Sequence, residues 1–261
     1  MLNEYSARCH VGKVRENNED NLYVDGVSLT PDTRERPFTI DGIAYHPAIF
    51  AVCDGMGGGD DGEIASLLAI QALNNADNGI KSAAAGRLGE AIQTYVDEVS
   101  ESIFFETDLS GKRAGTTLAL AAVLEDGVFC FNLGDSRIYG LQNTVFKQIT
   151  NDHTLSAEQK RSGVITQDQA IGVKDGNKLT RCIGIGAMQN VESYPALFGE
   201  CRILICSDGL TDMVDTKEIE NIMRISKRSA NAADSLLSTA LANGGKDNVT
   251  IIVVDVKSSK T

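Results

Sequence analysis

Acidic residues stand at the ends of the apolar segments of this sequence, where several carboxylates can meet at one edge of a sheet. The acids in such positions are Glu19, Asp20, Asp54, Asp135, Asp208 and Asp247. Unpaired carboxylates brought close together repel each other unless cations hold them. An oxygen-only ligand set suits Mg²⁺ or Mn²⁺ better than zinc, which favours His or Cys. A single Asp-Gly is usually a turn, but the set as a whole predicts a site for divalent cations.

Short apolar or β-rich segments must position these acids. The expected strands cover residues 47–53, 116–124, 128–133, 202–206 and 249–256. Glu125-Asp126-Gly127 separates the second and third of these and favours an antiparallel hairpin. The segment 118–123 is apolar at every position, which indicates cover on both faces by a second sheet or by helices. The pattern therefore predicts a layered sandwich.

Helical periodicity appears in two blocks between and after these strands. Apolar residues recur at the spacing of one helix face in the expected helices, at residues 64–72, 88–103, 217–226 and 232–241. Gly244-Gly245 is expected to end the last of them. A polar excursion at 29–47 is predicted to contain a surface hairpin turning at Asp41-Gly42. The aperiodic segment 156–178 is expected to be either a mobile flap or an ordinary connection.

Composition limits the function classes. Charged residues make up 23% and hydrophobic residues 42% of the 261 residues, typical of a globular protein, and we expect one domain over residues 1–261. The net charge of −12 argues against nucleic acid or an anionic membrane as partner. No apolar run reaches membrane-span length and the start lacks a signal-peptide pattern, so we expect a cytoplasmic monomer. The six cysteines lack zinc spacing, and Cys53, Cys130 and Cys206 are expected to be buried free thiols.

An ordered series of motifs resembles the protein phosphatase 2C family, the metal-dependent protein serine/threonine phosphatases, and is most similar to its bacterial members. The motifs are Arg15-Glu16-Asn17-Asn18-Glu19-Asp20-Asn21, Asp54-Gly55-Met56-Gly57-Gly58, Gly115-Thr116-Thr117, Gly134-Asp135-Ser136-Arg137, Cys206-Ser207-Asp208-Gly209-Leu210 and Asp247-Asn248-Val249-Thr250. They occur in the family's order and cover nearly the whole chain. The resemblance implies an α+β fold, a four-layer α-β-β-α sandwich with two central antiparallel sheets.

The resemblance also implies a ligand set for two ions, Mn²⁺ or Mg²⁺. Asp54 would bridge them, the Gly55 carbonyl would bind one, and Glu19 would act through bound water. Asp20, Asp208 and Asp247 would complete the set. Asp135, together with Asp208, could hold a third ion.

Arg15 would bind the substrate phosphate, because a guanidinium offers two parallel donors to phosphate oxygens. Arg15 and Asp54 are thus the expected catalytic residues. Two ions can activate a shared water for in-line attack on phosphorus, so no protein nucleophile is needed. Met56 stands where some family members carry a His that can protonate the leaving group, and metal-bound water is expected to take that role. His153 is expected to be structural.

The expected function is hydrolysis of phosphoserine and phosphothreonine in proteins, with targets of a serine/threonine kinase as substrates. Two alternatives stay open: a narrow-specificity regulatory phosphatase of an anti-sigma antagonist, and a non-catalytic pseudophosphatase that only binds. The second is disfavoured because every expected acid is present. A phosphate loop at Gly55-Met56-Gly57-Gly58-Gly59 is excluded because no Gly-Lys-Ser/Thr follows.

Overall fold

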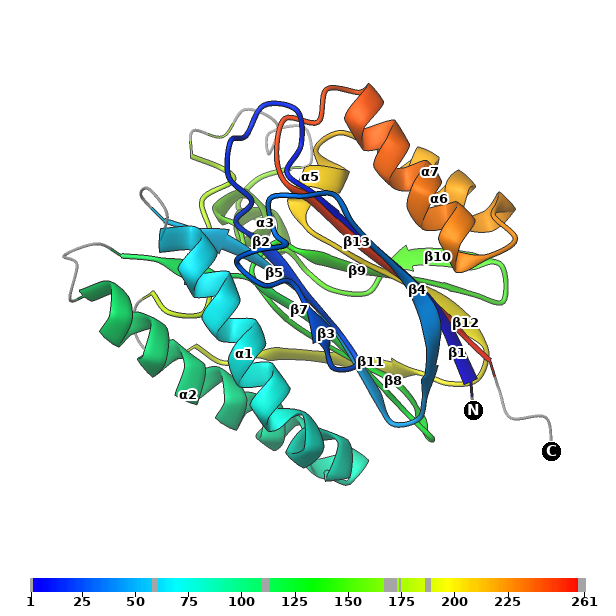
Figure 1. Ribbon diagram of the computed structural model, residues 1–261, viewed down its shortest axis with the longest axis horizontal. Helices are drawn as coiled ribbons and strands as arrows, with labels where there is room; N and C mark the ends of the chain where they lie inside the picture. The colour runs from blue at the N-terminus through cyan, green and yellow to red at the C-terminus, as the bar shows by residue number, and fades with distance from the viewer. Residues whose placement is uncertain are drawn as a thin grey trace.

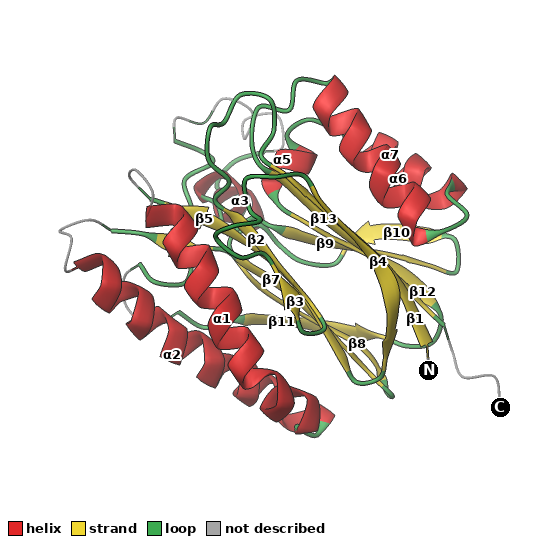
Figure 2. Ribbon diagram, in the orientation of Figure 1, coloured by secondary structure: helices red, strands yellow, loops and turns green. Residues whose placement is uncertain are grey.

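Two antiparallel β-sheets face each other and carry helices on their outer faces (Figures 1 and 2). The computed structural model describes residues 2–57, 61–108, 113–166, 173, 175–185 and 189–257. In these residues one sheet has the order β10-β9-β12-β13-β1-β4, and the other has the order β11-β8-β7-β5-β2-β3 with β6 paired to β5. The α+β four-layer sandwich predicted from the sequence is confirmed.

The strands are β1 (Leu2–His10), β2 (Asp20–Val24), β3 (Val27–Ser28), β4 (Phe38–Tyr45), β5 (Ala48–Met56), β6 (Gly115–Thr116), β7 (Leu118–Leu124), β8 (Gly127–Leu133), β9 (Arg137–Gln142), β10 (Val145–Gln148), β11 (Glu192–Leu197), β12 (Cys201–Cys206) and β13 (Val249–Val256). The helices are α1 (Asp61–Ser82), the 3-10 helix η1 (Ala85–Arg87), α2 (Leu88–Asp108), α3 (Leu155–Arg161), α5 (Asp208–Thr211), α6 (Thr216–Ile225) and α7 (Ser229–Ala242).

Strand β7 lies between two apolar layers, as its sequence predicts. All of its residues are buried. Leu118 and Leu120 belong to the core beneath α1 and α2, whereas Ala119 and Ala121 belong to the core between the two sheets. Because successive side chains of a strand point to opposite faces, a continuous apolar run fits a strand covered on both sides. The hairpin to β8 turns before Gly127, whose φ is 144°.

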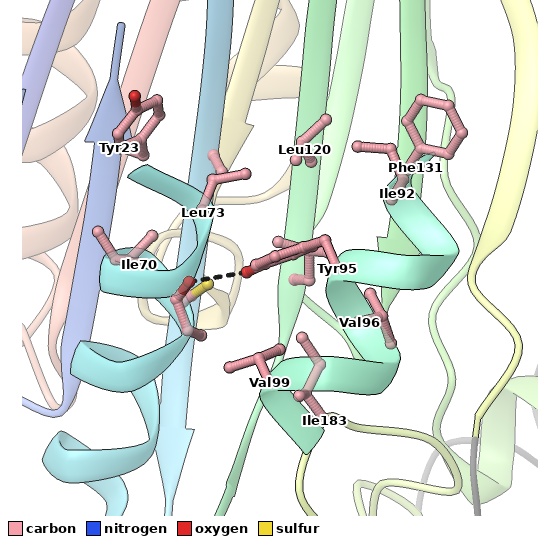
Figure 3. Packing of buried hydrophobic residues seen from close by; sticks show 14 of the residues in the cluster. Tyr23, Ile70, Leu73, Ile92, Tyr95, Val96, Val99, Leu120, Phe131 and Ile183 are labelled. Carbon is pink, nitrogen blue, oxygen red and sulfur yellow. Dashed lines mark hydrogen bonds between the residues drawn. The ribbon is translucent and has the colours of Figure 1, made fainter. Parts of the chain in front are cut away.

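Helices α1 and α2 cover the outer face of the seven-stranded sheet (Figure 1). Figure 3 shows Ile70 and Leu73 of α1 beside Val96 and Tyr95 of α2, over the sheet. The Tyr95 hydroxyl donates to the carbonyl of Ala69 at 2.9 Å, so the polar end of this buried ring is satisfied. The two helices are thereby joined by a hydrogen bond as well as by apolar packing.

Helices α6 and α7 cover the outer face of the six-stranded sheet. Asp215 caps α6 by accepting from the backbone N–H groups of Lys217 and Glu218, both at 2.9 Å. The predicted stop after α7 is confirmed: Gly244 and Gly245 have φ of 130° and 52°, in the region that favours glycine.

The hairpin predicted at Asp41-Gly42 is wrong, because these residues lie in the middle of the single strand β4. Asp41 and Gly42 pair with Ser6 and Tyr5 of β1. Asp41 accepts from the Arg8 guanidinium at 2.8 Å, and a Cβ on Gly42 would lie 2.5 Å from the Tyr5 hydroxyl oxygen. This Asp-Gly pair therefore fits its neighbours on β1 instead of making a turn.

The expected flap at 156–178 begins in α3, and its residues 167–172 and 174 lie outside the described residues. All six cysteines are buried and unpaired, which confirms the prediction for Cys53, Cys130 and Cys206. In the part of the chain that the structure describes, no helix is long and apolar enough to cross a membrane.

Candidate metal centre

Asp54 and Asp20 lie directly opposite each other on the paired strands β5 and β2. Strand β5 extends further than the sequence pattern predicts, so Asp54 lies within the strand, and Asp20 is the first residue of β2. The backbone of Asp54 is held by two threonines: its N–H donates to Thr117 Oγ1 at 2.9 Å, and its carbonyl accepts from Thr116 Oγ1 at 2.9 Å. The Gly-Thr-Thr motif therefore fixes Asp54, a role that the sequence analysis did not assign.

Two hydroxyl groups orient the carboxylate of Asp20. Ser207 Oγ and Thr250 Oγ1 each donate to Asp20 Oδ2 at 2.7 Å. Asp20 is 1% exposed, and its other oxygen, Oδ1, is buried without a hydrogen-bond partner. Such an orphaned carboxylate oxygen is costly in a protein interior unless another group binds it. Ser207 and Thr250 are further site residues that the sequence analysis left without a role.

Asp208 and Asp247 approach from the other sheet. Asp208 is the first residue of α5 and is separated from β12 by Ser207 alone. Asp247 precedes β13, and its Oδ1 accepts from the backbone N–H of Asn248 at 2.8 Å. Because β12 and β13 are neighbours, the two acids reach the same edge of the sandwich.

The electrostatic surroundings of Asp54 indicate that five acids converge. Burial raises its pKa well above the usual value, and the carboxylates of Asp20, Asp208, Asp135 and Asp247 raise it further. Burial is likewise the main cause that raises the pKa of Asp20 and of Asp135 to about 7, and that of Asp208 to about 6. Carboxylates crowded in this way favour either protons or cations among them.

The donor set fits a hard divalent cation. Every converging side chain is a carboxylate, and Asp20 Oδ1 lacks any other partner. As the side chains stand, no three His, Cys, Asp or Glu residues in the described ranges form a group arranged to hold a metal ion. Hydrogen bonds from Ser207, Thr250 and Arg15 hold two of these oxygens, Oδ2 of Asp20 and Oδ2 of Asp247. Binding of an ion therefore requires side-chain rearrangement as well as loss of protons.

Glu19 and Gly55 pack tightly against the start of α1. The Gly55 N–H donates to the Glu19 carbonyl at 3.1 Å. A Cβ on Gly55 would lie 2.0 Å from the Gly62 carbonyl oxygen, and one on Gly62 would lie 2.5 Å from Glu19 Oε1. Glycine is required at position 55, where a Cβ would meet backbone atoms, and this close approach places Glu19 and Gly55 beside Asp54.

Arg15 lies at the edge of the acidic cluster. Its Nη2 donates to Asp247 Oδ2 at 2.7 Å, and 49% of the side chain is exposed. Partial burial lowers the pKa of Arg15, but Asp247, with smaller effects from Glu19 and Asp54, raises it overall. The guanidinium is therefore both close to the carboxylates and open to solvent.

His153 is fully buried and has two partners. Its Nδ1 accepts from the Gly134 N–H at 3.1 Å, and its Nε2 lies 2.7 Å from Glu192 Oε2. Burial is the main cause that lowers its pKa. These contacts fit the structural role expected of His153, since it supports the turn that carries Asp135.

A cavity of ≈ 430 Å³ adjoins the centre between the β9–β10 hairpin and α3. Asp135 and Asp208 line the side next to the acidic cluster, and Lys160 and Asn177 are also part of its lining. The cluster therefore opens onto a space large enough for several side chains.

Comparison with known proteins agrees with this fold and site. Residues 43–243 match the family Protein phosphatase 2C. The serine/threonine phosphatase stp of Listeria innocua is 35% identical over 257 residues, covering 95% of this chain and 94% of the relative. The serine/threonine protein phosphatase PstP of Mycobacterium tuberculosis is 32% identical over 258 residues. The match covers 98% of this chain but only 45% of PstP, which is longer.

Solved structures are similar as well. The Mycobacterium tuberculosis phosphatase PstP/Ppp has a TM-score of 0.78 at 30% identity, covering 98% of this chain and 100% of that one. The catalytic domain of PstP in complex with two manganese ions has a TM-score of 0.76 at 30% identity, covering 99% of this chain and 100% of that one. The chain belongs to the protein phosphatase 2C family.

Proposed function

We propose that this family member hydrolyses phosphoserine and phosphothreonine in proteins at the centre around Asp54. The observation that carries the proposal is the convergence of Asp20, Asp135, Asp208 and Asp247 on a half-buried Asp54, with the guanidinium of Arg15 at the edge. This arrangement supplies cation ligands and a phosphate-binding group side by side. The names of the relatives, serine/threonine phosphatases, support the substrate class.

Divalent cations are the cofactors of this proposal, with Mn²⁺ or Mg²⁺ favoured by the oxygen donors. Asp54 would bridge two ions, with Glu19, Asp20, Gly55, Asp208 and Asp247 as the other ligands. Asp135 and Asp208 would hold a third. When bound, the ions supply an activated water and offset charge on the phosphoryl oxygens.

The protein's own residues do the remaining work. Arg15 binds and orients the substrate phosphate, because its fork can contact two oxygens at once. Ser207 and Thr250 hold Asp20 in one rotamer, and Thr116 and Thr117 hold the backbone of Asp54. Preorganised groups of this kind avoid reorganisation when charge develops on the phosphate.

A cysteine nucleophile is disfavoured. All six thiols are buried, and burial is the main cause that raises the pKa of each, to about 11 for Cys182 and about 12 for Cys206. A thiol with so high a pKa is not a thiolate at neutral pH. Direct hydrolysis therefore fits this chain better than transfer through a phosphocysteine.

We also infer that residues 1–261 act as one catalytic domain, because the acids come from both sheets. Six buried, unpaired cysteines fit a reducing compartment such as the cytoplasm. The substrates would be targets of a serine/threonine kinase, and the protein would act as a monomer.

Turnover of a phosphothreonine peptide tests the proposal directly. We expect phosphate release with manganese, little release after chelation, and recovery when manganese is restored. The Asp54→Asn protein, shown to be folded by circular dichroism, is the matched control. Absence of turnover by the wild-type protein with any divalent ion would favour a binding role and overturn the proposal.

A further inference from the structure

The side chain of Asn248 joins the C-terminal part of the centre to the loop that carries Arg15. Its Nδ2 donates to the carbonyls of Val11 and Asn17, both at 2.9 Å. Its Oδ1 accepts from the backbone N–H of Glu19 at 2.8 Å. Asn248 is 4% exposed, and so these bonds are shielded from water.

The two hydrogen bonds from Nδ2 join the two ends of a short segment, the arc 12–16, through a single amide group. Residues 12–16 lie between Val11 and Asn17, and Arg15 is in this arc. Val14 is 65% exposed, so its side chain contributes little burial to fix the arc. A further backbone bond, from the Lys13 N–H to the Gly245 carbonyl at 2.7 Å, joins the arc to the same turn.

The shape of the site leaves little freedom around Asn248. A Cβ on Gly209 would lie 1.9 Å from the Asn248 carbonyl oxygen, and a Cβ on Gly12 would lie 2.3 Å from that of Asp247. The turn 244–248 therefore packs closely against α5 on one side and against the loop 11–19 on the other. An amide with one acceptor and two donors matches all three backbone groups that it meets.

We propose that Asn248 is the positioning residue for Arg15: it closes the loop 11–19 and so sets where the guanidinium stands relative to the carboxylates. The inference rests on the proposed role of Arg15 in phosphate binding. Without the amide, the arc 12–16 loses both of its closing bonds and Arg15 samples positions away from the phosphate. Asn248 itself does not touch substrate in this assignment.

Asn132 offers a matched control. It is fully buried, and its Nδ2 likewise donates to two carbonyls, those of Gly134 and Asn151, both at 3.0 Å. It closes a different loop, the one after β8. Asn132→Ala therefore removes an amide that joins two backbone carbonyls, without touching the loop 11–19.

The first experiment measures binding of inorganic phosphate to the manganese-loaded protein by calorimetry. We expect Asn248→Ala and Arg15→Ala each to weaken phosphate binding roughly tenfold. Metal content, measured by elemental analysis, should stay at the wild-type value. The double variant should bind phosphate no more weakly than Arg15→Ala alone, because Asn248 acts through Arg15. Asn132→Ala should leave the phosphate affinity unchanged.

Wild-type phosphate affinity in folded Asn248→Ala would overturn the assignment. So would a double variant whose loss of phosphate affinity is the product of the two single losses. A loss of phosphate affinity that merely follows a loss of metal would also contradict a role through Arg15. Should the alanine variant fail to fold, Asn248→Ser, which keeps a small polar side chain, carries the same test.

A second measurement is independent of catalysis. Hydrogen exchange of the metal-free protein should show faster exchange in residues 11–19 of Asn248→Ala, and not in Asn132→Ala. Unchanged exchange there would refute closure of the loop by Asn248. If wild-type protein neither binds phosphate nor hydrolyses peptide, the proposed function fails, whereas this exchange result still decides whether Asn248 holds the loop.

Discussion

Arg15 Nη2 lies 2.7 Å from Asp247 Oδ2, so the group that we assign to the substrate phosphate is paired with a carboxylate of the metal centre. Both side chains are partly exposed, at 49% and 35%. An ion pair in such a setting contributes at most about 1 kcal/mol. Arg15 therefore competes only weakly with a cation for Asp247 and can turn toward a phosphate at little cost.

Arg15→Lys should weaken catalysis but not metal binding. Lysine keeps the positive charge but lacks the planar fork of arginine. The loss of transition-state stabilisation should be about 1–3 kcal/mol, so kcat/KM should fall by about 5-fold to 150-fold. Metal affinity should change less than about fivefold, given the weak pair. Steady-state kinetics on an aryl phosphate and on a phosphopeptide should show the same defect. A defect confined to the peptide would assign Arg15 to protein recognition instead.

Asp54→Asn should abolish hydrolysis, because an amide offers one good acceptor where a bridging ligand needs two charged oxygens. Elemental analysis should show metal loss in parallel. Robust hydrolysis by this variant with unchanged metal content would be incompatible with Asp54 as the bridge.

Asp135→Ala should retain two ions and turn over more slowly. Asp135 lines the cavity together with Asp208 and is not among the ligands proposed for the first two ions, so its removal leaves those ligands intact. Calorimetric titration with manganese checks the stoichiometry. Loss of the first two ions would contradict the assignment of Asp135 to a third.

The metal-free protein should become less stable as the pH rises from about 4 to 7. Burial raises the pKa of Asp20 to about 7 and that of Asp208 to about 6, above the value of about 4 in an unfolded chain. The folded state then binds protons more tightly, so this stabilisation is complete below pH 4 and is lost as the pH rises through the folded pKa values.

Thermal unfolding of chelated protein at pH 5.5 and pH 7.5 measures this effect. The Tm should be higher at the lower pH, and Asp208→Asn should reduce the difference. Manganese added at pH 7.5 should raise the Tm again, because cations replace the protons. A pH dependence of the Tm that Asp208→Asn leaves unchanged would contradict the raised pKa of Asp208.

Tyr95→Phe should destabilise the protein by about 1 kcal/mol, since it removes the buried hydrogen bond to the Ala69 carbonyl and leaves the ring in place. Tyr45→Phe, at a tyrosine that is 70% exposed, is the control and should have little effect. Urea unfolding of both variants makes the comparison; equal midpoints would mean that the bond between α1 and α2 contributes nothing.

The sequence predicted those parts of the fold in which one physical signal dominates. Residues 118–124 are apolar throughout, and 249–256 are nearly so, and both are strands. Strand β1 was not predicted, because it buries polar residues. Arg8 is 3% exposed and binds Asp41 and Asp234, partners that come from distant parts of the chain. No local pattern reveals such pairing before the fold is known.

The acids of the candidate site were predictable because they flank the apolar segments of the sequence, and their convergence follows from the sandwich. The side chains that hold these acids in place were not predictable from the sequence. Ser207 and Thr250 act on Asp20 from more than 180 residues away in sequence, at 187 and 230 positions. The motif residue Asn248 carries no sign in the sequence that its side chain meets Val11, Asn17 and Glu19.

Strand β13 lies between β12 and β1, and pairs Val256 with Asn3. The middle of the six-stranded sheet is thus formed by segments from opposite ends of the described chain, and Asp247 belongs to the later one. During synthesis on the ribosome, β1 can pair early with β4, but its other neighbour, β13, exists only after nearly all of the described residues have been made. Such non-local pairing slows folding, and it means that a nascent chain can acquire catalytic activity only after β13 has emerged and been inserted.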